Sequence, residues 1–104
     1  MTDVHDIVAQ VKLATDYQIN KQILREKILT DLHVPFNGGL FLVTQELLSF
    51  LTIMNEEFLY LEDTYHNPIK VNRAGLLTVA REHYQQVMNR WHQQHEELKQ
   101  LRKI

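Results

Sequence analysis

The C-terminal third of the sequence carries the feature that most restricts how this chain can fold. Side chains that are almost all apolar recur there at alternating spacings of three and four, which is a heptad pattern along one face of a helix. Asn72 precedes the pattern and can cap the helix, so we expect one helix over residues 73 to about 103. We call this row of positions the seam; it comprises Leu77, Ala80, Tyr84, Val87, Trp91, Gln94, Leu98 and Leu101.

The length of this helix sets a geometric problem. A helix of about 30 residues is about 45 Å long, whereas a compact domain of this size has a diameter of about 35 Å. The helix must therefore extend past a rounded body, and exposure of Tyr84 or Trp91 on the seam would forgo about 1.5–3 kcal/mol each. Three neighbours can cover the seam: the first helix of the same chain, the same helix of a second chain, or an unrelated partner.

The first part of the chain, residues 3 to about 32, also has helical periodicity. Its apolar face shifts after Thr15. Either the helix breaks near Thr15, or one long helix meets different neighbours along its length. Thr15 with Gln18 resembles a capping box, which favours the break. The apolar positions are Val4, Ile7, Val8 and Val11 on one stripe, Tyr17, Leu24 and Ile28 on a second, and Ile19 and Ile23 on a separate side.

The middle part of the chain, residues 40–63, is apolar almost all round, which predicts a central helix covered on most sides. Its end is ambiguous, because residues 58–62 and 69–72 alternate enough to form a short β-hairpin around residues 65–68. We therefore predict an all-α fold of three main helices in an elongated helical bundle. The bundle forms a single helical domain over residues 1–104, and the hairpin between the second and third helices is left open.

Composition excludes several classes of site. The sequence has no cysteine, which rules out disulfides, thiolate metal sites and cysteine nucleophiles, and is compatible with a reducing, cytoplasmic location. No basic region leads into an apolar stretch at the N-terminus, so we expect no signal peptide. A net charge of -2 argues against a nucleic-acid or membrane-surface partner. Glu46, Glu56 and Glu57 interrupt the most apolar stretch, so we expect no membrane span.

Two groups of polar residues are candidates for chemistry. His92 and His95 lie three apart on one helix face and form a weak candidate metal site, which Glu96 or a second chain would have to complete. The alternative, which we favour, is that both are solvated residues beside the seam. Asp63 and His66 could make an acid–base pair, but polar residues are expected at a turn in any case.

Gly38 and Gly39 precede the predicted middle helix, so an anion could sit on that helix start, although a turn alone explains them. We assign no catalytic residue, no cofactor and no enzymatic activity.

One flank of the last helix is basic. Arg81, Lys99, Arg102 and Lys103 lie along it, near His92, and could meet phosphates or an acidic partner. Acidic residues lie on the same helix and no aromatic residues interleave the basic ones, so a solvated face is the simpler interpretation.

The run from Tyr65 to Asn72, which reads YHNPIKVN and is followed by a long helix, resembles small uncharacterised proteins of tailed phages. The resemblance covers less than half of the chain and contains no functional motif. It implies a phage or bacterial source and no particular activity.

The function that we predict is that of a non-enzymatic, oligomeric assembly or adaptor protein, most simply a homodimer, that uses the last helix as its contact surface. The first helix has more apolar faces than one contact within the chain requires, and the middle segment adds further apolar surface. The alternative is a small regulator that binds a larger protein or nucleic acid through the basic flank. The predicted interface residues are Leu77, Tyr84, Val87, Trp91, Leu98 and Leu101.

Overall fold

A computed structural model of the chain describes residues 4–102, with side chains for residues 7–101. The fold is mixed, with three helices and two antiparallel β-hairpins, so the prediction of an all-α helical bundle is wrong. The elements in chain order are α1 (Val4–Asp31), β1 (His33–Phe36), β2 (Gly39–Leu42), α2 (Gln45–Ile53), β3 (Phe58–Glu62), β4 (Pro68–Asn72) and α3 (Arg73–Arg102).

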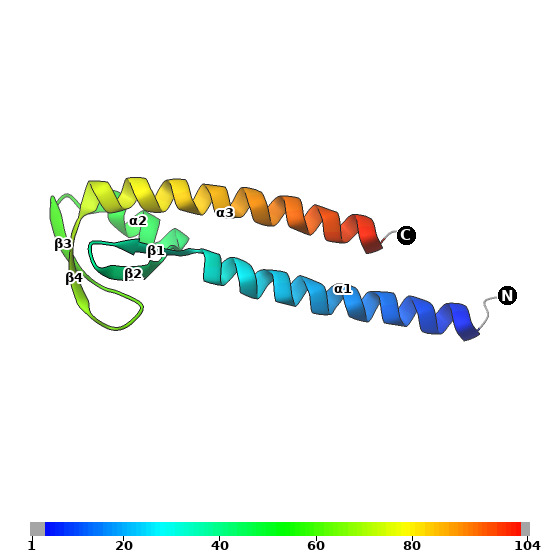
Figure 1. Ribbon diagram of the computed structural model, residues 1–104. Helices are drawn as coiled ribbons and strands as arrows, with labels where there is room; N and C mark the ends of the chain where they lie inside the picture. Colours follow the sequence, from blue (N-terminus) through cyan, green and yellow to red (C-terminus); the bar gives the residue numbers. More distant parts are fainter. Residues whose placement is uncertain (1–3, 103–104) are drawn as a thin grey trace.

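The molecule is strongly elongated. α1 and α3 run side by side in opposite directions, and the short elements gather at one end of this pair (Figure 1). We call the two hairpins, α2 and the first turns of α3 the body. We call α1 and the remainder of α3, which pack together, the arm. The extents are 68 × 23 × 19 Å and the radius of gyration is 19.7 Å, compared with about 13 Å for a compact domain of this length. Most of the arm therefore stands clear of the body.

The first hairpin replaces the start of the predicted middle helix. β1 pairs with β2 so that Phe36 lies opposite Gly39, and the two loop residues both have positive φ, at 48° for Asn37 and 86° for Gly38. These values define the mirror-image turn that Asn-Gly favours between antiparallel strands. The apolar run that begins at Leu40 is therefore a strand, and Gly38 and Gly39 form no helix start for an anion.

The second helix is much shorter than predicted, because it begins and ends at residues with specific partners. Thr44 caps its N-terminus, since the Thr44 hydroxyl accepts a 3.1 Å hydrogen bond from the Leu47 amide. At the other end the guanidinium of Arg73 donates to the backbone oxygen of Leu51 (2.9 Å) and to that of Glu56 (3.0 Å). The bond to Leu51 satisfies a carbonyl that the end of α2 leaves without a partner, and the bond to Glu56 fixes the segment that follows the helix.

The second hairpin, which the sequence analysis left open, is present over the residues whose apolar side chains alternate. β3 pairs with β4 in a register that places Phe58 opposite Asn72 and Glu62 opposite Pro68. The chain then passes directly into α3, whose start matches the predicted cap: the Asn72 side-chain oxygen accepts a 2.7 Å hydrogen bond from the Gly75 amide.

α1 is one continuous helix. The hydroxyl of Thr15 donates to the carbonyl of Val11 at 2.9 Å, one turn back along the helix, so Thr15 does not form the capping box that would have started a new helix. Of the two interpretations of this segment, the long helix that meets different neighbours is the correct one.

Separate clusters of buried side chains lie in the body and in the near half of the arm. In the body, Leu51, Val71 and Leu76 are fully buried between α2, the second hairpin and α3. In the arm, Ile28 of α1 and Leu32, the residue that directly follows this helix, pack against Val87 of α3. This burial holds the C-terminal part of α1 against α3. Large-to-small changes at such positions would be costly, because they leave cavities that the structure cannot fully close.

We predict that Gly39→Ala destabilises the fold. A Cβ atom at Gly39 would lie 2.8 Å from Cγ1 of Ile69 and 3.3 Å from Cβ of Asp63, so the two hairpins would have to move apart. We expect the free energy of unfolding to fall by about 1–3 kcal/mol, as for other overpacked sites, when it is measured by urea denaturation. The control is Gly38→Asn: a Cβ there meets nothing within 4 Å, so its loss reports only the strain of a positive φ, which Asn adopts more readily than most residues. Equal losses in the two variants would contradict the proposed close approach.

Candidate functional site

The seam is largely covered by its own chain. Val87 is fully buried against α1, and Trp91 and Tyr84 pack around the same cluster of α1 and α3 side chains. Further along the arm, Leu98 and Leu101 line a shallow groove with Tyr17 of α1. Of the predicted interface residues, Leu77, Tyr84, Trp91 and Leu98 are partly buried, Val87 is fully buried, and Leu101 is exposed.

The apolar surface without a partner lies instead on the opposite side of α1. Tyr17, Leu24 and Ile28 face α3, in agreement with the second stripe of the sequence. The side of α1 that points away from α3 carries a row that we call the outer stripe: Val8, Val11, Thr15, Ile19 and Ile23. The exposed fractions of its aliphatic members are 61% for Val8, 61% for Val11, 52% for Ile19 and 57% for Ile23.

The outer stripe is confined to the N-terminal two-thirds of α1. One turn beyond Ile23 the same side of the helix carries Glu26, whose carboxylate accepts a 3.2 Å hydrogen bond from the Gln22 side chain. At the middle of the stripe the Thr15 hydroxyl is already bonded to the carbonyl of Val11. Thr15 can therefore enter an apolar contact without leaving a buried hydroxyl unsatisfied.

The corresponding side of α3 is polar. Positions of α3 that point away from α1 are exposed and carry Thr78, Glu82, Gln85, Asn89, Gln93 and Gln100. The two helices of the arm therefore differ: α3 has one apolar side, which its own chain covers, whereas α1 has two, of which its own chain covers one.

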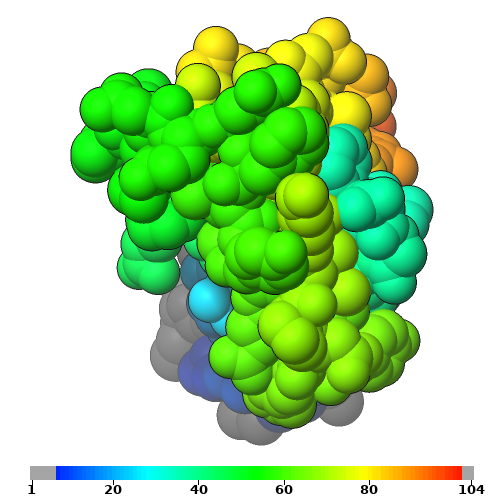
Figure 2. Space-filling view, turned by 90° about the vertical axis from the view of Figure 1, so that its left-hand side faces the viewer, coloured from blue at the N-terminus to red at the C-terminus, as the bar shows by residue number. Residues whose placement is uncertain are grey.

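A second group of exposed apolar side chains lies on the body, at the far end from the arm's tip. Ile53 of α2 and Phe58 and Tyr60 of β3 are the main members. Residues of α2 and the second hairpin fill most of this end of the molecule (Figure 2). The amino group of Lys70 lies 4.8 Å from the centre of the Phe58 ring, a cation–π contact that partly covers the aromatic face.

The paired histidines do not gather a metal-binding set. Trp91, His92 and His95 line a shallow depression on α3, but the carboxylate of Glu96 lies 3.2 Å from the amino group of Lys99. That hydrogen bond and the charge of Lys99 hold the pKa of Glu96 below its usual range. Within the side chains that the structure describes, no three potential ligands lie close enough together to hold a metal ion.

The described part of the chain includes two members of the basic flank with their side chains, Arg81 and Lys99. Arg81 is exposed, Lys99 is paired with Glu96, and the side chain of Arg102 and all of Lys103 lie outside the described residues.

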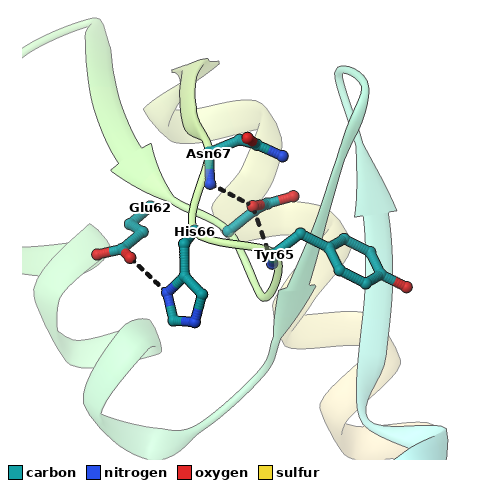
Figure 3. A network of polar contacts seen from close by, with 5 residues as sticks. Glu62, Tyr65, His66 and Asn67 are labelled. Carbon is teal, nitrogen blue, oxygen red and sulfur yellow. Dashed lines mark hydrogen bonds and ion pairs between the residues drawn. The ribbon is translucent and has the colours of Figure 1, made fainter.

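The acid–base pair considered for Asp63 and His66 does not form, and the two side chains have separate partners at the turn of the second hairpin. Nδ1 of His66 lies 2.6 Å from the carboxylate of Glu62, and both side chains are largely exposed. The carboxylate of Asp63 instead accepts backbone hydrogen bonds from Asn67 (2.9 Å) and Tyr65 (3.0 Å) within its own turn (Figure 3). Its second oxygen accepts from the Leu40 amide of the first hairpin (3.1 Å).

Asp63 therefore joins the two hairpins and has no catalytic geometry. Its side chain is 6% exposed. The Asn67 amide, with those of Leu40 and Tyr65, lowers the pKa of Asp63 from its ordinary value, against the opposing effect of partial burial. The turn spacing could have identified this role, because an aspartate at the start of a turn commonly accepts from the amides that follow it.

No protein-family model, no curated protein and no solved structure matches this chain. Within residues 4–102, none of the helices has the length and apolar character needed to cross a bilayer.

We predict that the two sides of α1 respond differently to truncation. Ile28 is 1% exposed and packs against Val87, so Ile28→Ala should lower the free energy of unfolding by about 2–4 kcal/mol. Ile19 on the outer stripe makes no such contact within the chain, so Ile19→Ala should change it by less than about 0.5 kcal/mol. Chemical denaturation in dilute solution would measure both. A large loss in Ile19→Ala under these conditions would show that the outer stripe is packed within the monomer.

We also predict a pH-dependent contribution from Asp63. Because its pKa is lowered in the folded chain, the ionised group stabilises the fold above the ordinary aspartate value of about 3.9, and this contribution is lost as the pH falls through the lower folded value. Asp63→Asn should therefore be less stable than the parent at neutral pH, and the difference should shrink on acidification below about pH 4.

Urea denaturation over a series of pH values measures the effect of Asp63→Asn. Glu62→Gln is the matched control, because its exposed pair with His66 contributes little. A difference between Asp63→Asn and the parent that stays constant from neutral to acid pH would contradict the role of the carboxylate charge.

Proposed function

We propose that this protein is a non-enzymatic assembly or adaptor protein that contacts other protein chains through its arm, most simply as an oligomer. The observation that supports this proposal is the outer stripe: four aliphatic side chains more than half exposed, in a row along one side of α1. The contact surface that we propose is therefore α1, in place of the seam of α3 that the sequence had indicated.

The position of the outer stripe supports a contact between chains. Contiguous apolar patches on soluble proteins commonly mark interaction sites, and this patch lies on a part of the molecule that protrudes from the body (Figure 1). The first turns of α1 also extend past the described end of α3 (Figure 1). A helical segment of only a few turns is marginally stable in water unless an apolar face of it is packed. A neighbour on the outer stripe would therefore stabilise this end of α1.

The polar residues of the described chain support a non-enzymatic role. The acidic group that is best placed to act in chemistry, Asp63, already accepts three backbone hydrogen bonds. His66 is directed to Glu62 on an exposed turn, and His92 and His95 lack a third ligand. We place the protein in the cytoplasm, on the ground that a cysteine-free chain is suited to a reducing compartment.

We predict that the protein associates at micromolar concentration and that charge on the outer stripe abolishes this association. Val11→Lys with Ile19→Lys would place two ammonium groups in the proposed contact, where desolvation of unpaired charge is strongly unfavourable. Light scattering coupled to gel filtration should give a multiple of the chain mass for the parent and one chain mass for the double variant. The fold should be retained, because both positions are exposed within the chain.

The matched control carries the same added charge on the polar side of the arm, as Gln85→Lys with Gln93→Lys. Both glutamines are exposed positions on α3, and the control should associate as the parent does. A parent protein that is a monomer throughout the micromolar range would contradict the proposed function.

A further inference from the structure

Resting on the proposed function, we infer that the occupant of the outer stripe is a second copy of this chain, bound with the two α1 helices antiparallel about a two-fold axis near Thr15. The inference adds the identity of the partner, its orientation and its register. Three properties of α1 and the shape of the body support it.

The outer stripe is complementary to itself when it is reversed. Val11 and Ile19 each lie four residues from Thr15, on opposite sides of it. Rotation about a two-fold axis at Thr15 therefore places Val11 of one chain opposite Ile19 of its partner, and places Val8 next to Ile23. A two-fold contact requires that one patch be complementary to its own copy, and β-branched aliphatic side chains of similar volume meet in both halves of this contact.

The centre of the stripe is suited to burial. In the antiparallel arrangement the two Thr15 side chains face each other at the axis. The hydroxyl of each donates to the carbonyl of Val11 in its own helix at 2.9 Å, so its hydrogen-bonding need is met within the chain and its methyl group remains available for packing.

The charges beside the stripe favour the antiparallel orientation. Lys12 and Asp16 lie one turn apart on the same flank of the outer stripe, and the structure shows no ion pair for either among residues 7–101. Antiparallel helices bring like flanks together, so Lys12 of each chain would lie within about 3 Å, along the helix axis, of Asp16 of the other. Parallel helices would bring the Lys12 flank against the opposite flank, where Gln18 and Arg25 lie and no acidic residue is present.

The shape of the body also favours the antiparallel orientation. Packed helices lie about 8–10 Å apart. The second hairpin reaches past the line of α1 on the side away from α3 (Figure 1). In a parallel pair the two bodies would occupy the same space beside the paired helices, whereas in an antiparallel pair they lie at opposite ends. The resulting particle would be about 100 Å long, from a chain of 68 Å and an overlap set by about 1.5 Å per residue.

Engineered cysteines test the register, because the chain has none of its own. Thr15→Cys should form a disulfide-linked dimer on mild oxidation, since a disulfide requires Cα atoms within about 7 Å. Val11→Cys and Ile19→Cys should each fail to cross-link alone, because identical residues would lie about 12 Å apart along the axis, and should cross-link when the two variants are mixed. Gln93→Cys, on the polar side of α3, is the control and should not cross-link.

The outcomes separate this inference from the proposed function. Cross-linking of Val11→Cys to itself would indicate parallel helices and overturn the inference while leaving an oligomer. The same holds for an oligomer in which none of the α1 cysteines cross-links. Small-angle X-ray scattering of the unmodified protein gives a second measure: a maximum dimension of about 100 Å is expected, whereas a value near the 68 Å of one chain with a doubled mass would overturn the antiparallel pair. A monomer in both experiments would overturn the inference and the proposed function together.

Discussion

One carboxylate holds together the two chain reversals on which the shape of this protein depends. Asp63 accepts from two amides of its own turn and from the Leu40 amide of the first hairpin, and the Thr64 amide donates back to the Leu40 carbonyl at 2.8 Å. Gly39 allows this contact, because a side chain there would collide with Ile69. With the hairpins joined in this way, α1 enters the body and α3 leaves it on the same side, and the arm is the consequence.

The arm in turn derives its stability unevenly along its length. Near the body, Ile28 and Val87 are fully buried, and the imidazole of His83 donates to the last carbonyl of α1, that of Asp31. Toward the tip, Tyr17 of α1 is buried, but its neighbours on α3 are the partly buried Leu98 and the exposed Leu101. The distal part of α1 is therefore the part whose stability would increase most if another chain packed on it, because packing of an apolar face stabilises a helix in water.

Local sequence signals are sufficient to predict α3, but they do not predict the elements in the middle of the chain. The Asn72 cap and the heptad spacing depend on neighbouring residues alone, and both appear as expected. The run from Leu40 to Leu42 continues into further apolar residues, and this pattern predicts a helix. The Asn37-Gly38 pair before it is, however, a strong signal for a tight hairpin. An apolar strand that is buried in a small body and a buried helix have the same hydrophobic pattern over so few residues. The contact of Asp63 with the Leu40 amide and the contacts of Arg73 with two carbonyls join residues 17 to 23 apart in sequence, and no periodicity reveals such contacts.

The sequence indicates that the apolar side of α3 needs a neighbour. In the fold α1 covers that side, and the exposed apolar side is instead on α1. A long helix with an apolar side needs a neighbour of similar length, and α1, with 28 residues against the 30 of α3, provides it within the chain. Two helices packed together cover one side of each and leave the outer sides to water. On α3 that outer side is polar, so the pair could end there. On α1 the outer side carries the outer stripe, which is apolar and exposed. The hydrophobic effect that pairs α1 with α3 therefore also favours a further neighbour on α1.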